Sequence, residues 1–430
     1  MTAISIGRVA SVFALVLAIW SCEGSVGSGT SKGEAGTAGS SGNSSEAGQT
    51  NNLSGEAGTA GMTAGSESSA GAAGSASGVI IRQLAAAPLD TCVLLSNGTI
   101  KCWGYNQCGQ VGVAAGTQIW PGTPVTVPGI SNATSISIGP TSACAVLGDG
   151  TVECWGCNDY GQLGDGTTTD SAVPVEVRGL SGARQVIAAS SCALLDDGKV
   201  VCWPLNPPPV AEAEPIAGSN LVVVKGISGA IQVTGYGYDS LCVLLDDHTV
   251  ACRGNNDYGQ LGDGTTEASA IPVVVPGLSD VVQIKGFGYA ICAVLEDGTV
   301  KCWGGFYNPD CGDGLDCMNS LLTPTVVAGL PPATQVATSS GVSCALLTDS
   351  TVRCWGDNRF GQLGDGTTTY SATPVAVEGL SGVQQVVVSN ACCALLQDGT
   401  ARCWGINSYG MFGDGTHNDS LVPVMVTAAP

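Results

Sequence analysis

Two short apolar runs separated by a polar turn recur along most of the chain. In Cys192-Ala-Leu-Leu-Asp-Asp-Gly-Lys-Val-Val-Cys202 both arms are apolar, and Asp197 lies at the centre. A three-residue loop with Gly at its left-handed position closes such a hairpin, and continuously apolar arms indicate buried strands. The same centre recurs at Asn97, Asp149, Asp247, Asp297, Asp349 and Asp398. The pattern therefore predicts seven buried β-hairpins. Because His248 and Ser350 replace the turn glycine in two copies, we expect mild strain at these positions.

Further short motifs follow each hairpin and complete a repeating unit. The second copy continues with Trp155-Gly156-Cys157-Asn158 and then with Gly161 to Thr167. A strand at Pro174-Val175 and a segment at Gln185-Val186-Ile187 close this unit. The units repeat at intervals of 48 to 52 residues, and no helical period is present. Residues 79–430 are therefore predicted to be all-β, with four short strands in each of seven repeats.

Paired cysteines ten residues apart mark the two arms of every hairpin. Directly opposed residues of an antiparallel ladder have Cα atoms about 4.5–5.5 Å apart, which a disulfide accepts. We predict the pairs Cys92–Cys102, Cys144–Cys154, Cys192–Cys202, Cys242–Cys252, Cys292–Cys302, Cys344–Cys354 and Cys393–Cys403. Cys311 and Cys317 flank one loop and are also expected to pair. The pairing of Cys108 with Cys157 stays open, and Cys392 is left over as a buried free thiol.

The cysteine count changes the expected location of the protein. Twenty cysteines accompany only two histidines, so disulfides in an oxidising compartment are favoured over metal sites. The uncharged stretch Val9–Trp20 suits a signal peptide, and Leu17 to Cys22 resembles a lipobox. We expect a signal peptide at 1–21 and lipidation of Cys22, with ordinary signal-peptide cleavage nearby as the alternative. Residues 22–78, rich in Gly, Ser, Ala and Thr, are expected to form a disordered tether.

The repeat motifs resemble those of the regulator of chromosome condensation family. Trp155-Gly-x-Asn158 and Gly161-Gln-Leu-Gly164 carry the resemblance, which extends over residues 79–430. It implies a seven-bladed β-propeller of four-stranded blades. The chain departs from the pattern at Pro204–Pro215, at Arg253 in place of Trp, and at Gly305–Cys317. We further predict that the strands at Val79–Ile81 and Pro423–Val426 share one blade and thereby close the ring.

Charge and composition exclude several classes of function. The net charge is −21 and the 14 basic residues are scattered, which argues against a nucleic-acid partner. No catalytic triad, phosphate-binding loop or histidine-containing metal site is recognisable, so we expect no enzyme activity and no cofactor. Asp165, Asp263, Asp365 and Asp414 offer one carboxylate per Asp-Gly-Thr loop, a weak calcium ligand set.

Binding to a partner is the remaining class of function. The candidate binding residues are the aromatic residues that lie outside the repeat pattern. Interfaces between proteins are commonly anchored by clustered aromatic residues. The candidates are Tyr236, Tyr238, Phe287 and Tyr289, followed by Phe306 and Tyr307; the alternative is that the first four fill the central channel. The recurring Tyr160, Tyr258, Phe360 and Tyr409 are interpreted as structural.

The sequence therefore favours a monomeric bacterial lipoprotein of the cell envelope, at the outer membrane, the periplasmic face or the cell surface. Its membrane contact is expected only through the N-terminal lipid, and its propeller is expected to bind a protein partner. The alternative is a carbohydrate-binding or glycan-processing surface protein. The resemblance also implies nucleotide exchange on a small GTPase, which the acidity, the export signals and the missing basic surface disfavour.

Overall fold

The computed structural model describes residues 78–115, 120–203, 213–216, 219–237, 240–307 and 318–427. Contacts divide the chain into two units, Met1–Ser77 and Gly78–Pro430. The first unit lies outside the described residues, as do Cys22, Tyr238, Cys311 and Cys317 with the predictions made for them. Within the described ranges, no helix is long and apolar enough to cross a membrane.

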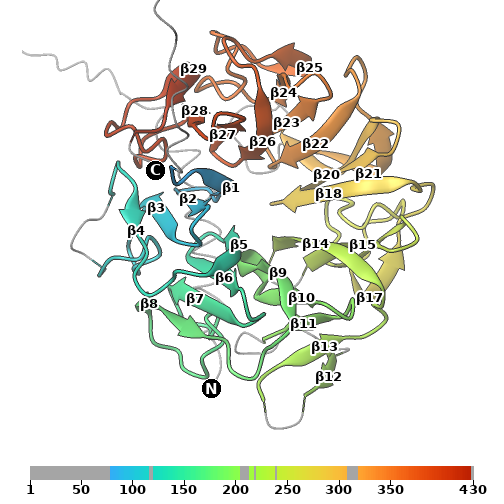
Figure 1. The fold of residues 1–430 in the computed structure, drawn as a ribbon. Coiled ribbons are helices and arrows are strands. Elements are labelled where there is room, and N and C mark those ends of the chain that lie inside the picture. Colours follow the sequence, from blue (N-terminus) through green and yellow to red (C-terminus); the bar gives the residue numbers. More distant parts are fainter. Residues whose placement is uncertain are drawn as a thin grey trace, which may run out of the picture. The chain divides into compact units, whose positions relative to one another are not determined.

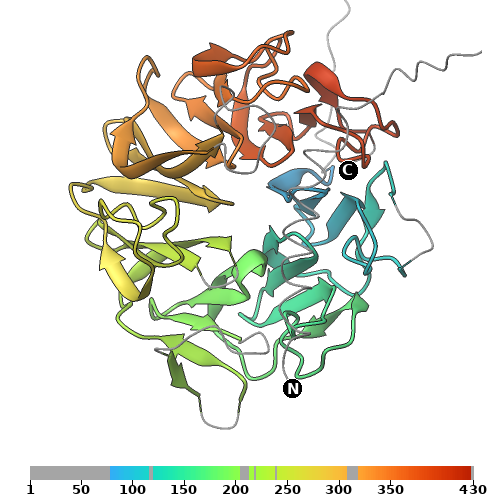
Figure 2. The same ribbon diagram turned by 180° about the vertical axis from the view of Figure 1, so that it is seen from behind.

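The second unit is a β-propeller of seven sheets arranged around a central axis (Figures 1 and 2). Six of the described sheets have four strands, and the third has five. The strands of the first three blades are β1 (Ile81–Ala86), β2 (Asp90–Leu95), β3 (Ile100–Gly104), β4 (Val125–Thr126), β5 (Ala133–Ile138), β6 (Ser142–Leu147), β7 (Val152–Gly156), β8 (Ser171–Glu176), β9 (Ala183–Ile187), β10 (Cys192–Leu195), β11 (Val200–Cys202), β12 (Ala213–Pro215) and β13 (Val222–Val224). A single 3₁₀ turn, η1 (Ala188–Ser190), follows β9.

The other four blades are regular four-stranded meanders. Their strands are β14 (Ala230–Gly237), β15 (Ser240–Leu245), β16 (Val250–Gly254), β17 (Ser269–Val274), β18 (Val281–Phe287), β19 (Ala290–Leu295), β20 (Val300–Tyr307), β21 (Met318–Val326), β22 (Ala333–Thr338), β23 (Val342–Leu347), β24 (Val352–Gly356), β25 (Ser371–Ala376), β26 (Val383–Val388), β27 (Ala391–Leu396), β28 (Ala401–Gly405) and β29 (Ser420–Met425). The predicted all-β class and the seven blades are confirmed.

The repeated hairpin forms the two middle strands of every blade. In the third blade Cys192 lies opposite Cys202, and the N–H of Gly198 donates to the carbonyl of Leu195 across the turn. The structure contains all seven predicted hairpin disulfides, with Cα separations of 4.0 to 4.1 Å. The turn residues His248 and Ser350 both have a φ of 63°, so they adopt the left-handed conformation that the sequence predicted.

The hydrophobic core lies between the blades. Each of the seven clusters of buried side chains combines residues of two neighbouring sheets. Between blades two and three, for example, Val152 and Leu163 pack with Val186 and Trp203. One blade alone has too little apolar surface for a core, so stacking around the axis is what stabilises the repeats.

Glutamine side chains join the innermost strands of neighbouring blades. The Gln83 amide donates to the carbonyl of Ile136 at 2.9 Å and accepts from its N–H at 3.1 Å. The same paired contact recurs from Gln185 to Val233, from Gln283 to Val336 and from Gln385 to Leu84. These glutamine clamps bridge strands that are too far apart to share a backbone ladder.

The ring closes differently from the prediction. β1 pairs with β2 in the first blade, whereas β29 pairs with β28 in the last, so the terminal strands do not share a sheet. Each blade is contiguous in sequence, and the first and last blades meet through side chains. Leu84 receives the Gln385 clamp, and the Trp103 indole donates to the carbonyl of Met411 at 2.7 Å.

Candidate functional site

The predicted aromatic residues fall into three groups in the structure. Tyr289 lies between β18 and β19, and Tyr307 ends β20; both are half-buried. Phe287 is half-buried at the end of β18, and Phe306 packs against the core between blades five and six. Tyr236 lies in β14 with only its backbone described. The structure therefore unites only part of the predicted set.

Tyr289 packs against a residue from the preceding blade. Its ring centroid is 4.7 Å from that of Tyr258, with the planes tilted by 49°. A Cβ on Gly305 would lie 3.0 Å from the Cβ atoms of both tyrosines, so a larger residue at this position would push against both of them. Burial, followed by the nearby Tyr258 and Asp257, raises the pKa of the Tyr289 phenol. Tyr258, interpreted from its recurrence as structural, thus belongs to the candidate site.

The loop after β22 positions both tyrosines of blade five. The N–H of Tyr289 donates to the Ser340 hydroxyl at 2.9 Å, and the N–H of Tyr307 donates to the Ser340 carbonyl at 2.8 Å. The guanidinium carbon of Arg359 lies 4.9 Å from the centre of the Tyr307 ring, within cation–π range. Its Nε donates at 3.1 Å to Asp357, which is buried and fixes the side chain.

Tyr258, Tyr289, Tyr307 and Arg359 thus form one surface across blades four, five and six, the tyrosine–arginine surface. Sequence reasoning missed Arg359 because it precedes the recurring Phe360 and therefore looks like part of the repeat. The one signal in the sequence is that Arg359 is the sole basic residue at this position, where the other copies of the motif have Gln107, Asp159, Asp257 and Ser408.

A second aromatic cluster lies between the last and first blades. The ring of Tyr409 is 5.9 Å from Tyr105 and 5.9 Å from Trp120, edge-on to both. Trp120 lies between β3 and β4 and is 49% exposed. Tyr105 has no aromatic counterpart in the other repeats, whereas Trp120 aligns with Tyr370 of blade six; sequence reasoning selected neither Tyr105 nor Trp120.

The Asp-Gly-Thr loops use their carboxylates internally. Asp165 Oδ1 accepts from the N–H of Thr167 at 2.9 Å and from the Asn158 amide at 3.2 Å. The same contacts recur at Asp263, Asp365 and Asp414. These donors give each carboxylate a structural role in shaping its loop.

The remaining cysteines do not form a metal centre in the described structure. The sulfurs of Cys108 and Cys157 lie within 4.8 Å of an Asp170 carboxylate oxygen, but they are bonded to each other. This disulfide, which the sequence left open, joins blades one and two. Cys392 is buried and unpaired, and burial raises the pKa of its thiol.

The repeats match known family models. The Regulator of chromosome condensation (RCC1) repeat matches residues 149–194, 247–294 and 349–396. A second model of the same repeat matches residues 91–110, 133–162, 333–362 and 386–410. The chain therefore contains RCC1 repeats.

Similar curated proteins are eukaryotic and longer than the matched region. The human E3 ubiquitin-protein ligase HERC2 is 29% identical over 294 residues, which cover 67% of this chain and 5% of the ligase. The Arabidopsis thaliana ultraviolet-B receptor UVR8 is 27% identical over 311 residues, or 71% of this chain and 59% of the receptor. The structure of Prp20p from Saccharomyces cerevisiae has a TM-score of 0.63 at 20% identity, covering 82% of this chain and 88% of that one. This last likeness shows the fold.

Proposed function

We propose that this propeller is a non-enzymatic binding protein that presents the tyrosine–arginine surface to a protein partner. The contiguous placement of Tyr258, Tyr289, Tyr307 and Arg359 on three blades carries the proposal. Tyrosine and arginine are enriched among the residues that dominate the energy of protein interfaces. Prp20p, which shares the fold, has binding properties toward Gsp1p and histones.

The scaffold supports this role because hydrogen bonds hold the candidate residues in place. Ser340 fixes the backbone of both blade-five tyrosines, and Asp357 orients Arg359. A surface that is ordered before binding loses little conformational entropy when the partner arrives.

We also propose that the propeller is exported as a monomer and held at the cell envelope through lipidated Cys22. Eight disulfides among the described residues support an oxidising compartment. Metabolic labelling with a fatty acid tests the anchor: the wild type is expected to incorporate it and Cys22→Ser to lose it.

The binding proposal is tested by capturing a partner from envelope extract with the full mature chain and then measuring its affinity for variants. The triple variant Tyr289→Ala, Tyr307→Ala, Arg359→Ala is expected to weaken binding at least a hundredfold, since each anchor contributes about 2 kcal/mol. Tyr160→Ala, at the recurring aromatic position of blade two, is the control and should bind normally. Normal affinity of a folded triple variant would place the site elsewhere.

A second candidate function is carbohydrate binding or glycan processing, favoured by the exposed Trp120 beside Tyr409 and Tyr105. Aromatic rings with one apolar face and one wet edge suit a surface contact of this kind. Screening the protein against a glycan array distinguishes the two candidates. Binding that is lost in Trp120→Ala but kept in the triple variant would favour the glycan.

A further inference from the structure

The seven innermost strands carry only basic charges. They are β1, β5, β9, β14, β18, β22 and β26, which surround the central opening in Figure 1. Their charged residues are Arg82, Arg184 and Lys285, and none of these strands contains Asp or Glu. Acidic residues outnumber basic ones by 35 to 14 in the chain. A lining whose three charged residues are all basic is therefore the opposite of what the composition predicts.

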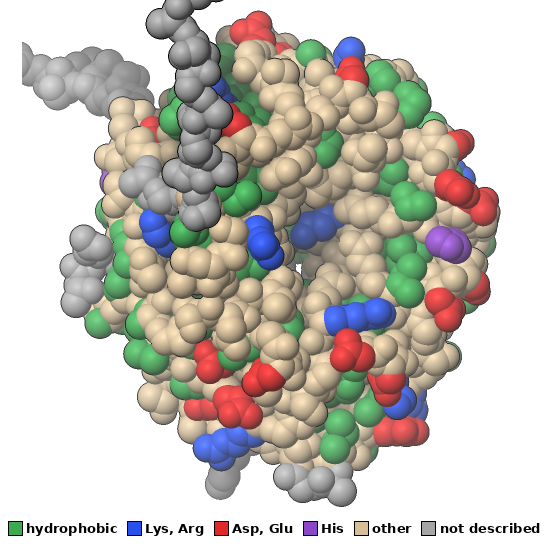
Figure 3. Space-filling model, in the orientation of Figure 1, with side chains coloured by type: hydrophobic (Ala, Val, Ile, Leu, Met, Phe, Trp, Pro, Cys, Tyr) green, Lys and Arg blue, Asp and Glu red, His purple; other side chains and the backbone are tan. Residues whose placement is uncertain are grey.

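Two of these cations share one structural position. In every innermost strand the register shifts at the second residue, which is left unpaired in the ladder. Arg82 and Arg184 occupy this position in the first and third blades and are exposed. Arg184 also donates to the carbonyl of Ala230 in the next blade. Figure 3 shows Lys and Arg side chains gathered around the central opening.

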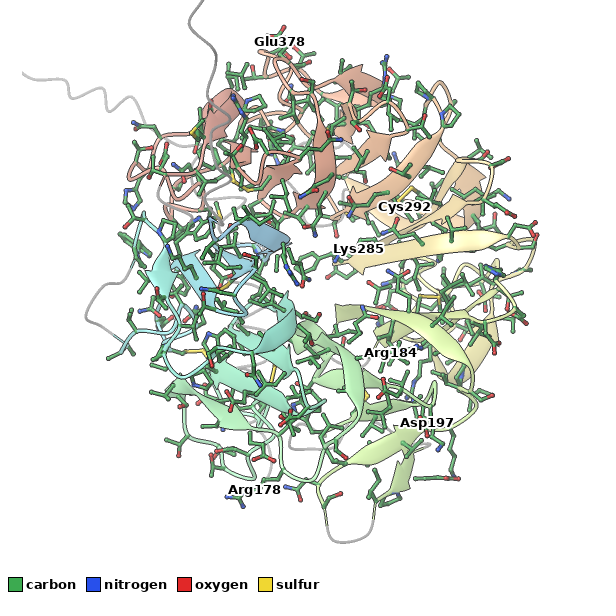
Figure 4. All side chains as sticks on the ribbon, viewed as in Figure 1. Arg178, Arg184, Asp197, Lys285, Cys292 and Glu378 are labelled. Carbon is green, nitrogen blue, oxygen red and sulfur yellow. A yellow bond between two sulfur atoms is a disulfide. The ribbon has the colours of Figure 1, made fainter. Side chains whose placement is uncertain are left out.

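Lys285 lies farther along the channel. It comes three residues after the unpaired position of β18, a distance of about 10 Å along the strand. Figure 4 places Lys285 at the inner end of β18 and Arg184 below it, and β9 and β18 lie two blades apart around the ring. The other innermost strands carry uncharged residues at the corresponding position: Ala85, Ser137, Ile187, Thr234, Ala337 and Val387.

The Lys285 side chain is exposed to solvent, and it lies at the inner end of β18, where the innermost strands ring the central opening. The surrounding protein desolvates the charge and lowers its pKa. Within the described part of the chain, the Lys285 ammonium makes no side-chain hydrogen bond or ion pair, whereas its backbone belongs to the β18–β19 ladder. A desolvated cation without an anionic neighbour is a costly arrangement that a bound anion would relieve.

We propose that the central channel binds a small polyanion of the polyphosphate or polycarboxylate class, with Arg82 and Arg184 contacting it at the mouth and Lys285 inside. Arginine donates paired hydrogen bonds to phosphate and carboxylate oxygens, and lysine supplies a point charge. The acidic exterior repels large polyanions, which favours a small ligand over a nucleic acid. This site is separate from the tyrosine–arginine surface and goes beyond the proposed function.

The test is isothermal titration calorimetry of the full mature chain with tripolyphosphate and, separately, with citrate at low ionic strength. One ligand per chain is expected, with affinity that falls as salt is added. Binding of tripolyphosphate alone assigns the site to phosphates, and binding of citrate alone assigns it to carboxylates. If neither probe binds at millimolar concentration, the proposal is wrong.

The site is located by comparing single variants that each remove one positive charge. Lys285→Met and Arg184→Met are each expected to weaken binding about tenfold, which corresponds to ~1.4 kcal/mol. Lys199→Met removes one positive charge from an exposed hairpin turn outside the innermost strands and should leave the affinity within twofold. Equal weakening by Lys199→Met, or wild-type affinity in both channel variants, would overturn the proposal. Melting curves of each variant separate a binding defect from a folding defect, and Arg82→Met replaces any variant that does not fold.

Discussion

Asp90 has a carboxyl group that is buried in the protein interior. It begins β2 and is 1% exposed, and its Oδ1 has no hydrogen-bond partner within the described structure. Burial raises its pKa well above the ordinary value, and no cation compensates. On the adjacent strands, Lys101 lies opposite Val93, and the unpaired Arg82 lies at the register shift beside Leu94 and Leu95, so both cations are nearer the far end of β2 from Asp90. Blades two, three and four have Ser142, Ser190 and Ser240 at the same position.

We therefore predict that Asp90→Ser stabilises the fold at pH 7 by about 1–3 kcal/mol, the cost of an unsatisfied buried polar group. The folded pKa lies above the unfolded value of about 3.9, so the wild type loses stability as pH rises from that value toward the folded pKa. The gain from Asp90→Ser should be small at pH 3 and large at pH 7 in denaturant unfolding. Ser142→Asp, the reverse change, should show the opposite pH dependence. A gain of equal size at both pH values would contradict this account.

Ser350 carries the strain that its sequence predicts. Its φ of 63° lies in the left-handed region, where a Cβ costs roughly 1 kcal/mol and glycine costs nothing. Ser350→Gly should therefore raise stability by about 1 kcal/mol in thermal unfolding. Gly150→Ser, at the same turn position of blade two, is the reverse variant and should destabilise the fold. If the two changes act in the same direction, the turn conformation is not the cause.

Two further non-glycine residues, Asp280 and Ser191, have a left-handed backbone conformation that the sequence analysis did not predict. Asp280 has a φ of 57° and stands where other repeats have Gly182, Gly229 and Gly382. Aligning that connection would have revealed it, as aligning the hairpins revealed His248 and Ser350. Ser191, with a φ of 49°, ends a 3₁₀ turn found in a single blade, so no repeat pattern marks it.

At the scale of elements, a tryptophan attaches five of the seven blades to the blade before it, and the contact of Trp103 with Met411 at the ring closure is one of the five. The indoles of Trp155, Trp203, Trp303 and Trp404 donate to the carbonyls of Gln110, Gln162, Gln260 and Gln362 in the preceding blade. This contact explains two departures in the sequence together. Copy three lacks the Gly-Gln-Leu-Gly loop, and copy four has Arg253 in place of the tryptophan that such a loop would receive.

The glutamine clamps give a prediction about the seams between blades. Gln385→Leu leaves the N–H and carbonyl of Leu84 without their partners, and Gln283→Leu does the same to Val336. Each variant should lose at least about 2 kcal/mol of stability, because two buried backbone groups become unsatisfied. Gln384→Leu changes an exposed neighbour and is the control.

The comparison of the two clamp variants also tests how the ring closes. Gln385 lies at the seam between the last and first blades, and Gln283 lies between blades five and six. Because each clamp makes the same pair of hydrogen bonds to the next blade, the two losses in urea unfolding should agree within experimental error. A much larger loss at Gln385 would mean that ring closure is the weak point of the molecule.

At the scale of the whole molecule, the number of blades and the strands in each blade were predictable because the same hairpin pattern occurs seven times in the sequence. The way in which the ring closes was not predictable, because the repeating sequence does not show at which strand each blade begins. The segment at Gln185 to Ile187 was interpreted as the end of a unit, but β9 is the first strand of blade three. Likewise, the contact of Arg359 with Tyr307 depends on how two blades face each other, which no single repeat encodes.

We predict that the hairpin disulfides supply a large part of the stability of the complete propeller, in addition to the packing between blades. Each hairpin pair closes a loop of about ten residues, which the chain-entropy model values at about 2.7 kcal/mol, or about 19 kcal/mol for all seven. Typical domains are stable by only about 5–15 kcal/mol, so the reduced chain is expected to be unfolded at 37 °C even if half of that sum is realised. Circular dichroism of the oxidised and the reduced, alkylated protein measures the effect. Since the reduced thiols would still fill the core, equal melting temperatures would show that packing between blades, rather than cross-linking, holds the fold.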